Sequence, residues 1–377
     1  MKIALHIETT KLMTGPGRYM NCLLKEYLTR FPEHSYILYR VAGLRNLFPS
    51  SVFSSLRKEK VDIRTFGLFG SMIHSIREVF PIDDLYLRDA DVIHFQGNHI
   101  PSLSSRKKIV VTIHDLVPLI LPEIIPKYMV KRWQKWIHKF RNTKFDWIIA
   151  DSESTRKDLI EIGEISPLDR IRVIPLAISP EYGQSIDEKT AQATLERLKL
   201  SSPYLLSVGT IEPRKNYVRL IQAYNMLRKE NIFSGKLVIV GKRGWMSEPI
   251  FRAYNNALFR SDILLLGYLS NDEIRCLYQK AKLVAFVSLY EGFGFPLLEA
   301  FASKVSVISS NKGSLPEVGG EAAVYVDPYD AASIAEGIKT VLLDESLAAK
   351  LRMKGLERLK AYSWEKTARE TFELYLK

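Results

Sequence analysis

Two carboxylates and two glycines surround the expected start of a helix in residues 291–300, which read EGFGFPLLEA. Pro296 suits a first helical turn, and free backbone amides of residues 294–297 there would bind an anion. Glu291 lies before this helix and Glu299 about one turn into it, so the pair can accept hydrogen bonds from separate hydroxyls of one elongated ligand. The alternative is a glycine-rich turn with two solvated glutamates.

A pair of cations follows another expected strand, in residues 207–216, which read SVGTIEPRKN. Arg214 offers a planar fork of donors and Lys215 a mobile point charge, a combination that can hold a diphosphate beside Gly209. Cations at a helix start oppose the helix dipole, so their placement is easier to understand if an anion binds there. The alternative is an ordinary basic helix start.

His114 ends an expected strand of the first half, in residues 112–118, which read TIHDLVP. An imidazole at the carboxyl end of a parallel strand can hydrogen-bond a sugar hydroxyl or a developing charge, although a lone histidine is often structural. His94 ends a neighbouring strand and is a weaker candidate. The seven histidines are scattered without a recurring ligand spacing, so no metal site is expected.

A glycine-containing loop follows the first strand in residues 13–19, which read MTGPGRY. Gly15 and Gly17 would allow the backbone to approach a phosphate, but the third glycine of a dinucleotide fingerprint is missing. Nicotinamide or flavin binding is therefore disfavoured, and a simple β–α turn is the open alternative.

The length of 377 residues fits two domains, and the net charge of +12 calls for an anionic partner. The two cysteines fall in separate halves, so we expect neither a disulfide framework nor a cysteine metal site, and a reducing cytoplasm is the natural compartment. No apolar run is long enough to span a membrane, and the first residues read as a strand rather than a secretory signal.

Short β-branched runs alternate with longer amphipathic ones, which predicts strand–helix units around parallel sheets. The turn-rich residues 176–184 predict a linker between two doubly wound domains, 1–178 and 179–362. From about residue 344 the chain is expected to be helical, with a new helix starting near Ser363. The expected strands are 2–7, 35–40, 61–65, 92–95, 109–113, 147–150, 171–174, 204–208, 236–240, 263–266, 283–287, 305–308 and 323–326.

Together, these segments resemble the retaining GT-B glycosyltransferases of the large bacterial family 4, which includes mannosyltransferases of O-antigen and capsule synthesis. The resemblance rests on Glu-x(7)-Glu with its Gly-Phe-Gly-Phe-Pro insert, on Gly-Thr-x-Glu-Pro-Arg-Lys-Asn and on His-Asp-x-x-Pro. It extends from residue 15 to residue 365. It implies two Rossmann-like domains facing a cleft, the first for the acceptor and the second for the nucleotide sugar, with a C-terminal helix (363–377) returning to the first.

The resemblance also implies roles for the candidate residues. Arg214 and Lys215 would bind the donor diphosphate, Glu291 the hydroxyls of the transferred sugar, and Glu299 the ribose. His114 would lie beside the donor sugar. Backbone groups would line the donor site at Gly15, Gly17, Gly209, Gly292, Phe293, Gly294 and Phe295. The commoner leucine is replaced by Phe295, and Pro16 stiffens the N-terminal loop, which weakens its phosphate role.

The implied reaction is a metal-independent hexosyl transfer with retention, onto a glycan or lipid-linked oligosaccharide in surface polysaccharide synthesis. GDP-mannose is the leading donor, with UDP-glucose or UDP-N-acetylglucosamine as alternatives. A silent sugar-nucleotide or glycan-binding subunit is a further alternative. An epimerase or a phosphorylase is disfavoured by the Glu-x(7)-Glu element, and nucleic-acid binding rests on charge alone.

A basic amphipathic helix is expected within residues 127–144, which carry seven lysines and arginines and no acid. Tryptophan and lysine on one helix suit an anionic membrane surface, which would place the protein on the inner face of the cytoplasmic membrane. The alternative is a helix that packs its aromatic stripe into the first domain and leaves a solvated basic face. Both remain open from the sequence.

Overall fold

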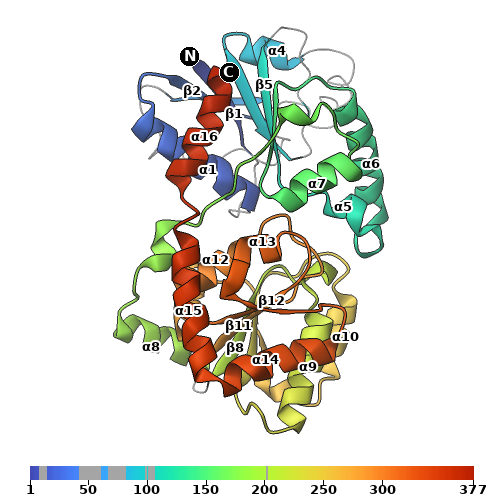
Figure 1. Cartoon of the computed structure of the whole chain (residues 1–377), viewed down its shortest axis with the longest axis vertical. Coiled ribbons are helices and arrows are strands. Elements are labelled where there is room, and N and C mark those ends of the chain that lie inside the picture. Colours follow the sequence, from blue (N-terminus) through green and yellow to red (C-terminus); the bar gives the residue numbers. More distant parts are fainter. Residues whose placement is uncertain (8–14, 42–60, 67–81, 98–99, 101–106, 201–202) are drawn as a thin grey trace. The chain divides into compact units, whose positions relative to one another are not determined.

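A computed structural model of the chain describes residues 1–7, 15–41, 61–66, 82–97, 100, 107–200 and 203–377. The chain divides into two compact units. The first consists of Met1–Leu116, Arg132–Leu176 and Trp364–Lys377, and the second of Val117–Lys131 and Ala177–Ser363. Each unit has a parallel sheet of its own with helices packed on it (Figure 1).

The first unit contains a seven-stranded sheet in the order β3-β2-β1-β4-β5-β6-β7. Every neighbouring pair in it is parallel. The order changes direction between β1 and β4, which is the topological switch point of a doubly wound sheet. The strands are β1 (Lys2–His6), β2 (Ser35–Val41), β3 (Val61–Phe66), β4 (Val92–Gln96), β5 (Lys108–Ile113), β6 (Trp147–Ala150) and β7 (Ile171–Val173).

The helices of this region connect successive strands, except for α16, which returns from the end of the chain. The ring of Phe372 on α16 stacks on Phe31 with centroids 3.8 Å apart, and Arg30 pairs with Glu365 at 2.9 Å. This confirms the predicted return of the C-terminal helix. The helices are α1 (Gly15–Arg30), α4 (Ile82–Leu87), α6 (Lys127–Arg141), α7 (Glu153–Glu161), η2 (Leu168–Arg170) and α16 (Trp364–Leu376). Two further helices between β5 and β6, α5 (Val117–Ile120) and η1 (Pro122–Ile124), belong to the second unit, as do the first residues of α6.

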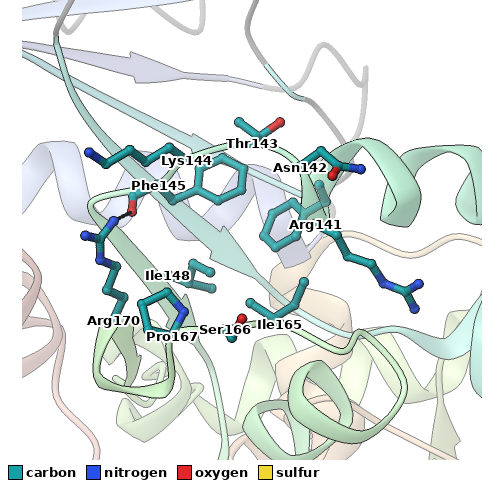
Figure 2. Close-up of a pocket in the computed structure, with 11 residues that line it drawn as sticks. Arg141, Asn142, Thr143, Lys144, Phe145, Ile148, Ile165, Ser166, Pro167 and Arg170 are labelled. Atoms are coloured by element: carbon teal, nitrogen blue, oxygen red, sulfur yellow. Dashed lines mark hydrogen bonds between the residues drawn. The ribbon is translucent and has the colours of Figure 1, made fainter.

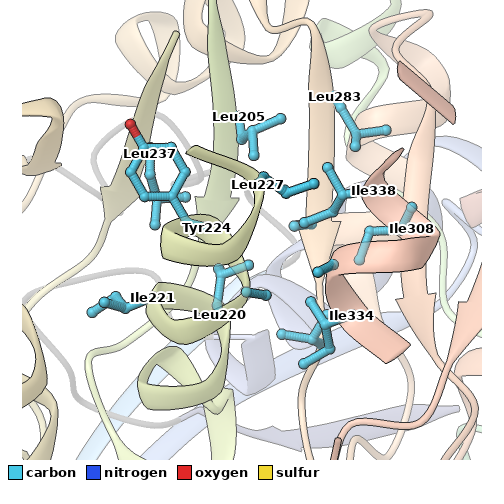
Figure 3. Close-up of a cluster of buried hydrophobic side chains, with 14 of the residues drawn as sticks. Leu205, Leu220, Ile221, Tyr224, Leu227, Leu237, Leu283, Ile308, Ile334 and Ile338 are labelled. Carbon is cyan, nitrogen blue, oxygen red and sulfur yellow. The ribbon is translucent and has the colours of Figure 1, made fainter. Parts of the chain in front are cut away.

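The second unit contains a six-stranded sheet in the order β10-β9-β8-β11-β12-β13, again with parallel neighbours. Its switch point lies between β8 and β11. Apolar side chains of α9 and α14 pack onto this sheet, as Figure 3 shows for Leu220, Leu227 and Ile338. The strands are β8 (Tyr204–Val208), β9 (Lys236–Val240), β10 (Ile263–Leu265), β11 (Leu283–Phe286), β12 (Val307–Ser310) and β13 (Val324–Val326).

Several helices of the second unit begin at side-chain caps. Ser270 and Glu273 form a reciprocal capping box at the start of α11, and Asp344 accepts a hydrogen bond from the Leu347 amide at the start of α15. The helices are η3 (Pro180–Gly183), α8 (Glu188–Arg197), η4 (Pro213–Lys215), α9 (Tyr217–Lys229), α10 (Glu248–Asn255), η5 (Arg260–Asp262), α11 (Asn271–Lys280), α12 (Phe295–Ala302), α13 (Leu315–Gly319), η6 (Gly320–Ala322), α14 (Ala331–Leu343) and α15 (Glu345–Leu359).

The doubly wound α/β class predicted from the sequence is confirmed, and each predicted strand is present within two residues of its expected bounds. One local prediction is wrong. Gly15 and Gly17 were expected in a loop, but α1 begins at Gly15, so both lie in its first turn. Residues 13 and 14 of that motif lie outside the described residues. Among the described helices, none combines the length and the apolar character needed to cross a membrane.

Candidate functional site

The switch point of the second sheet brings together two of the sequence motifs. Gly209, Arg214 and Lys215 follow β8, and Glu291 follows the neighbouring strand β11. Ligands of doubly wound sheets bind at the carboxyl ends of the strands where the order reverses. The candidate site of this unit therefore lies where the topology predicts.

The connection from β8 to α9 holds the two cations in a fixed turn. Asn216 ends η4 in the left-handed conformation, and its side-chain amide donates to the carbonyls of Val287 (3.0 Å) and Pro328 (2.6 Å). Gly209 has a φ of 156°, and a Cβ there would come within 2.9 Å of the Lys215 side chain. A residue with a side chain at position 209 would thus displace Lys215.

Arg214 and Lys215 form an ion-pair cluster with two glutamates. The Lys215 ammonium donates to Glu291 Oε1 at 2.6 Å, and the Arg214 guanidinium donates to Glu291 Oε2. Arg214 also donates through Nε to Glu212 Oε1 at 3.0 Å. Both carboxylates are buried, and both cations are half-buried. Two positive and two negative charges thus lie together at the ends of β8 and β11.

Burial and pairing act in opposite directions on the ionisation of this cluster. Burial pushes the pKa of Glu291 up, but Arg214 and Lys215 outweigh it and hold that pKa at about 2. Burial raises the pKa of Glu212, with Arg214 opposing, and burial lowers the pKa of Lys215. Glu291 is consequently the firmly ionised carboxylate, while Glu212 is the one that is more easily protonated.

The backbone of residues 291–294 is held by the start of α13. The Ser314 hydroxyl donates to the carbonyls of Glu291 (3.0 Å) and Phe293 (2.5 Å), which fixes Gly292 between them. Gly294 caps α12 with a φ of 121°, and Phe293 contacts Phe295 with ring centroids 5.5 Å apart. The expectation of free amides as far as Leu297 is wrong at its end, because the Leu297 amide donates to the Gly294 carbonyl at 3.0 Å.

Glu299 lies one turn into α12 and is buried, rather than solvated. Its Oε2 accepts a hydrogen bond from the buried Tyr278 hydroxyl at 3.1 Å. Burial and the neighbouring Glu299 raise the pKa of Tyr278, so the phenol remains a donor at neutral pH. Glu299 therefore has a fixed position in the second unit.

A second polar cluster follows strands β4, β5 and β6 in the first unit. His114 Nδ1 is 2.5 Å from Oδ2 of Asp151, and His114 Nε2 is 3.0 Å from Oε1 of Gln96. Asp151 is 1% exposed and its other oxygen has no partner among the described residues. Burial raises the pKa of Asp151, and His114 opposes this rise. The pair gives the imidazole a fixed orientation at the carboxyl end of the sheet.

His94 is structural, so its candidacy as a site residue is wrong. Its Nδ1 is 2.5 Å from the Tyr375 hydroxyl and its Nε2 is 2.8 Å from Thr112 Oγ1, both buried groups. Burial lowers the pKa of His94 to about 3, which keeps the ring neutral. The ring links the sheet to α16 and is fully buried.

Four supporting residues were not found from the sequence: Glu212, Asn216, Gln96 and Asp151. Glu212 and Asn216 lie inside the quoted motif, so their proximity to the cations was available as a signal. Asp151 directly follows a predicted strand, which is where site residues of doubly wound sheets occur. No local pattern reveals that it pairs with His114, 37 positions away.

The amphipathic helix α6 packs its aromatic stripe inward. Trp136, Ile137 and Phe140 are buried, and Phe140 contacts Phe145 with ring centroids 4.4 Å apart. The basic face is solvated. Its exposed cations without an ion partner in the described part of the chain are Lys127, Lys131, Arg132, Lys135 and Lys139.

A pocket of about 240 Å³ lies between the segment that connects α6 to β6 and the loop that precedes β7 (Figure 2). Its two arginines hold main-chain carbonyls, since Arg141 donates to Gly163 (2.7 Å) and Arg170 to Phe145 (2.9 Å). The pocket is at the amino ends of these strands, away from the ends that carry His114 and Asp151. It is not a candidate for the main chemistry.

No group of three or more histidine, cysteine, aspartate or glutamate side chains is arranged to hold a metal ion within the described ranges. The two arrangements that remain are a cation–carboxylate cluster and a histidine–aspartate pair. The first can bind a phosphorylated ligand and the second can orient an imidazole.

Comparison with known proteins relates the chain to sugar-transferring enzymes. The profile described as "Glycosyltransferase Family 4" matches residues 58–182 and that of "Glycosyl transferases group 1" matches residues 189–358. The chain is 30% identical to the Escherichia coli O-antigen chain mannosyltransferase B over 393 residues, covering 100% of this chain and 99% of the relative. It is 32% identical over 280 residues to the E. coli serotype-specific mannosyltransferase WbdA, covering 73% of this chain and 34% of that protein.

Solved structures show the same fold. The crystal structure of Anabaena HepE in complex with UDP and glucose superposes with a TM-score of 0.78 at 16% identity, covering 99% of this chain and 98% of that one. Identity this low establishes a common architecture and no more.

Proposed function

Because the chain belongs to glycosyltransferase family 4, we propose that it transfers a mannosyl residue from GDP-mannose to a glycan or lipid-linked oligosaccharide, with retention and without a metal. The observation that carries the proposal is the cluster of Arg214, Lys215 and Glu291 at the switch point of the second unit. Mannose is favoured because O-antigen chain mannosyltransferase B is similar over the full chain.

In this proposal Arg214 and Lys215 hold the donor diphosphate and neutralise the charge that develops as it leaves. Glu291 accepts hydrogen bonds from hydroxyls of the transferred sugar, and Glu299 does so from the ribose. Backbone groups from Gly209 and from residues 292–295 line the site. Gly15, Gly17 and His114 belong to the first unit, and we propose roles for them in the same reaction. Asp151 orients His114.

Glu291 is a poor candidate for a covalent nucleophile or a general base. Its two oxygens are each bound by a cation, and its pKa is held at about 2. Efficient general bases have pKa values close to the working pH. We therefore assign proton removal from the acceptor to an oxygen of the departing diphosphate, on the same face as the new bond.

The test is a thermal-shift panel without divalent metal, using GDP-mannose, UDP-glucose and UDP-N-acetylglucosamine. A ligand that binds the native state raises its stability by mass action. We expect a shift with GDP-mannose that is lost in Arg214→Ala. The matched control is Arg352→Ala, which removes an arginine paired with Glu345 on α15 and should leave the shift intact.

The other outcomes of the panel discriminate the alternatives. A shift with a UDP-sugar alone would replace the donor and keep the reaction class. A shift without transfer to any glycan or glycolipid acceptor would favour a silent binding subunit. The anomeric configuration of the product, read by NMR, tests retention.

We further propose that α6 attracts the protein to the anionic inner face of the cytoplasmic membrane. Because the aromatic stripe is buried, this attraction would be electrostatic, through the exposed lysines and arginine of the basic face named above. We expect flotation with phosphatidylglycerol liposomes at low salt that disappears near 0.5 M salt, where charges are screened over roughly 4 Å.

A triple variant, Lys131→Gln with Lys135→Gln and Lys139→Gln, should weaken this flotation. The matched control neutralises Lys350 and Lys354 on α15 and Lys360 at its C-cap. Equal loss in both variants would show that net charge, rather than the face of α6, attracts the protein.

A further inference from the structure

The cation–carboxylate cluster is electrically balanced before any ligand binds. Arg214 and Lys215 contribute two positive charges, and Glu212 and Glu291 contribute two negative ones. The diphosphate of a nucleotide sugar is a diester of charge about −2 whose groups do not titrate near neutral pH. Bound beside this cluster, it would leave the buried region with an uncompensated negative charge, which is unfavourable at low dielectric.

We propose that Glu212 takes up a proton from solvent when a nucleotide sugar binds at Arg214 and Lys215, so that the diphosphate replaces the Glu212 carboxylate as the partner of Arg214. This inference rests on the proposed function. In the bound state Glu212 is a neutral carboxylic acid, while Glu291 remains ionised. No covalent bond changes; a single proton passes from the buffer to the carboxylate.

The geometry assigns the proton to Glu212 rather than to Glu291. The Glu291 carboxylate contacts both cations, one at each oxygen, whereas the Glu212 carboxylate contacts Arg214. Glu212 therefore loses the larger share of its pairing when Arg214 turns to the diphosphate. Glu212 is 1% exposed, and within the described part of the chain its carboxylate forms a hydrogen bond and an ion pair with Arg214. Burial already raises its pKa, and an incoming anion raises it further.

Other charged groups near Glu212 do not compete for this proton. The Tyr217 hydroxyl of α9 donates to the Gly209 carbonyl at 2.8 Å, and burial raises the pKa of Tyr217, so it is already protonated. Arg243 forms a β-bridge with Ile211, which precedes Glu212. Its guanidinium donates hydrogen bonds to Ser247 (3.0 Å) and Glu248 (2.9 Å) rather than to Glu212.

The linkage has a definite sign. Between the Glu212 pKa of the free protein and the higher one of the complex, the free form is ionised and the bound form is protonated. In that window the affinity falls as pH rises, by up to about tenfold per pH unit, and outside it the affinity is independent of this group. The window lies above the usual glutamate pKa of about 4.3, since the pKa of Glu212 is raised in both states.

The experiment is titration calorimetry of GDP-mannose and UDP-glucose at several pH values, each in PIPES, HEPES and Tris, whose ionisation enthalpies differ. The dependence of the observed heat on buffer gives the number of protons taken up. We expect a value approaching one in the wild type within the window, near zero in Glu212→Gln, and retained in Glu212→Asp. Glu321→Gln, an exposed carboxylate of the same unit, should match the wild type.

Binding without proton uptake at any pH between 5 and 9 would overturn this inference and leave the proposed function standing. Uptake that persists in Glu212→Gln would overturn the assignment to Glu212. Failure of both nucleotide sugars to bind the wild type would overturn the proposed function and this inference together. If circular dichroism shows that Glu212→Gln does not fold, the number of protons taken up by the wild type and by Glu212→Asp still tests the inference.

Discussion

The two sheets have the same strand order: in each, the first strand lies between the second and the fourth. The side chains that follow these strands nevertheless differ in chemistry. In the second unit two cations and two carboxylates form a cluster of fixed charges. In the first unit a histidine is held between a buried aspartate and a glutamine. One topology thus carries a cation–carboxylate cluster in one unit and an oriented imidazole in the other, because the side chains that follow the strands differ.

The difference lies in how each cluster responds to the loss of one member. Removing a cation from the second unit leaves two buried carboxylates with one positive charge between them, which is unfavourable. Removing Asp151 from the first unit leaves the imidazole with its neutral contact to Gln96, so no buried charge loses its partner. We therefore expect larger effects from the first kind of change than from the second.

Lys215→Met should give the largest effect. It removes the ammonium that binds Glu291 at 2.6 Å and, in our proposal, the donor diphosphate. We expect kcat/KM for sugar transfer to fall by about 10²–10³, the range for losing one group that stabilises developing charge. Lys282→Met, which disrupts an exposed pair with Glu345, should change it less than about twofold. Equal rates in both variants would show that Lys215 is not part of the donor site.

Glu291→Gln should alter the dependence of stability on pH. The folded-state pKa of Glu291 is depressed to about 2, so its ionised form stabilises the fold above the unfolded pKa of about 4.3. This contribution, at most about 3 kcal/mol, is lost as pH falls from about 5 towards 2. Urea unfolding across this range should show a steeper loss of stability in the wild type than in the variant. Parallel curves would mean that the cations do not hold Glu291 ionised.

Asp151→Asn should have an intermediate effect on activity. It keeps the shape of the contact with His114 but removes the charge. A hydrogen bond to a charged group contributes about 1.5–3 kcal/mol, so we expect kcat to fall by about tenfold to a hundredfold. The pH profile of kcat should change along with it, and Asp151→Glu should restore part of the rate. A lower melting temperature with an unchanged kcat would indicate a purely structural role.

Gln96→Leu should have the smallest effect. It removes the amide oxygen Oε1 that lies 3.0 Å from His114 Nε2. A neutral hydrogen bond contributes about 0.5–1.5 kcal/mol, so kcat should fall by about twofold to tenfold, with nucleotide affinity unchanged. A loss as large as that of Asp151→Asn would mean that both partners position the ring equally.

The sheets could be predicted because buried parallel strands have short, nearly continuous apolar sequences, such as residues 236–240 and 283–286. The positions of Arg214, Lys215 and Glu291 at strand ends followed from the same pattern. Pairing across long stretches of sequence could not be predicted. Lys215 and Glu291 are 76 positions apart, and nothing local states that they neutralise one another.

His94 shows the same limit from the other side. The sequence predicts that it ends a strand as His114 does, but it lies within β4 and is buried against Tyr375, a residue 281 positions away on α16. The partner that makes this histidine structural is supplied by the returning helix. A histidine near the carboxyl end of a strand therefore indicates a site only when no other element covers it.

The return of α16 to α1 also sets an order for folding on the ribosome. Trp364–Lys377 is synthesised after all of the second unit, yet it supplies Phe372 and Tyr375 to the core of the first. Domains generally fold as units during synthesis, so the second unit can fold completely while the first still lacks the helix α16. Until α16 has been synthesised, Tyr27 and Phe31 lack their aromatic partners Tyr375 and Phe372. The first unit therefore begins synthesis before the second but completes its core after it.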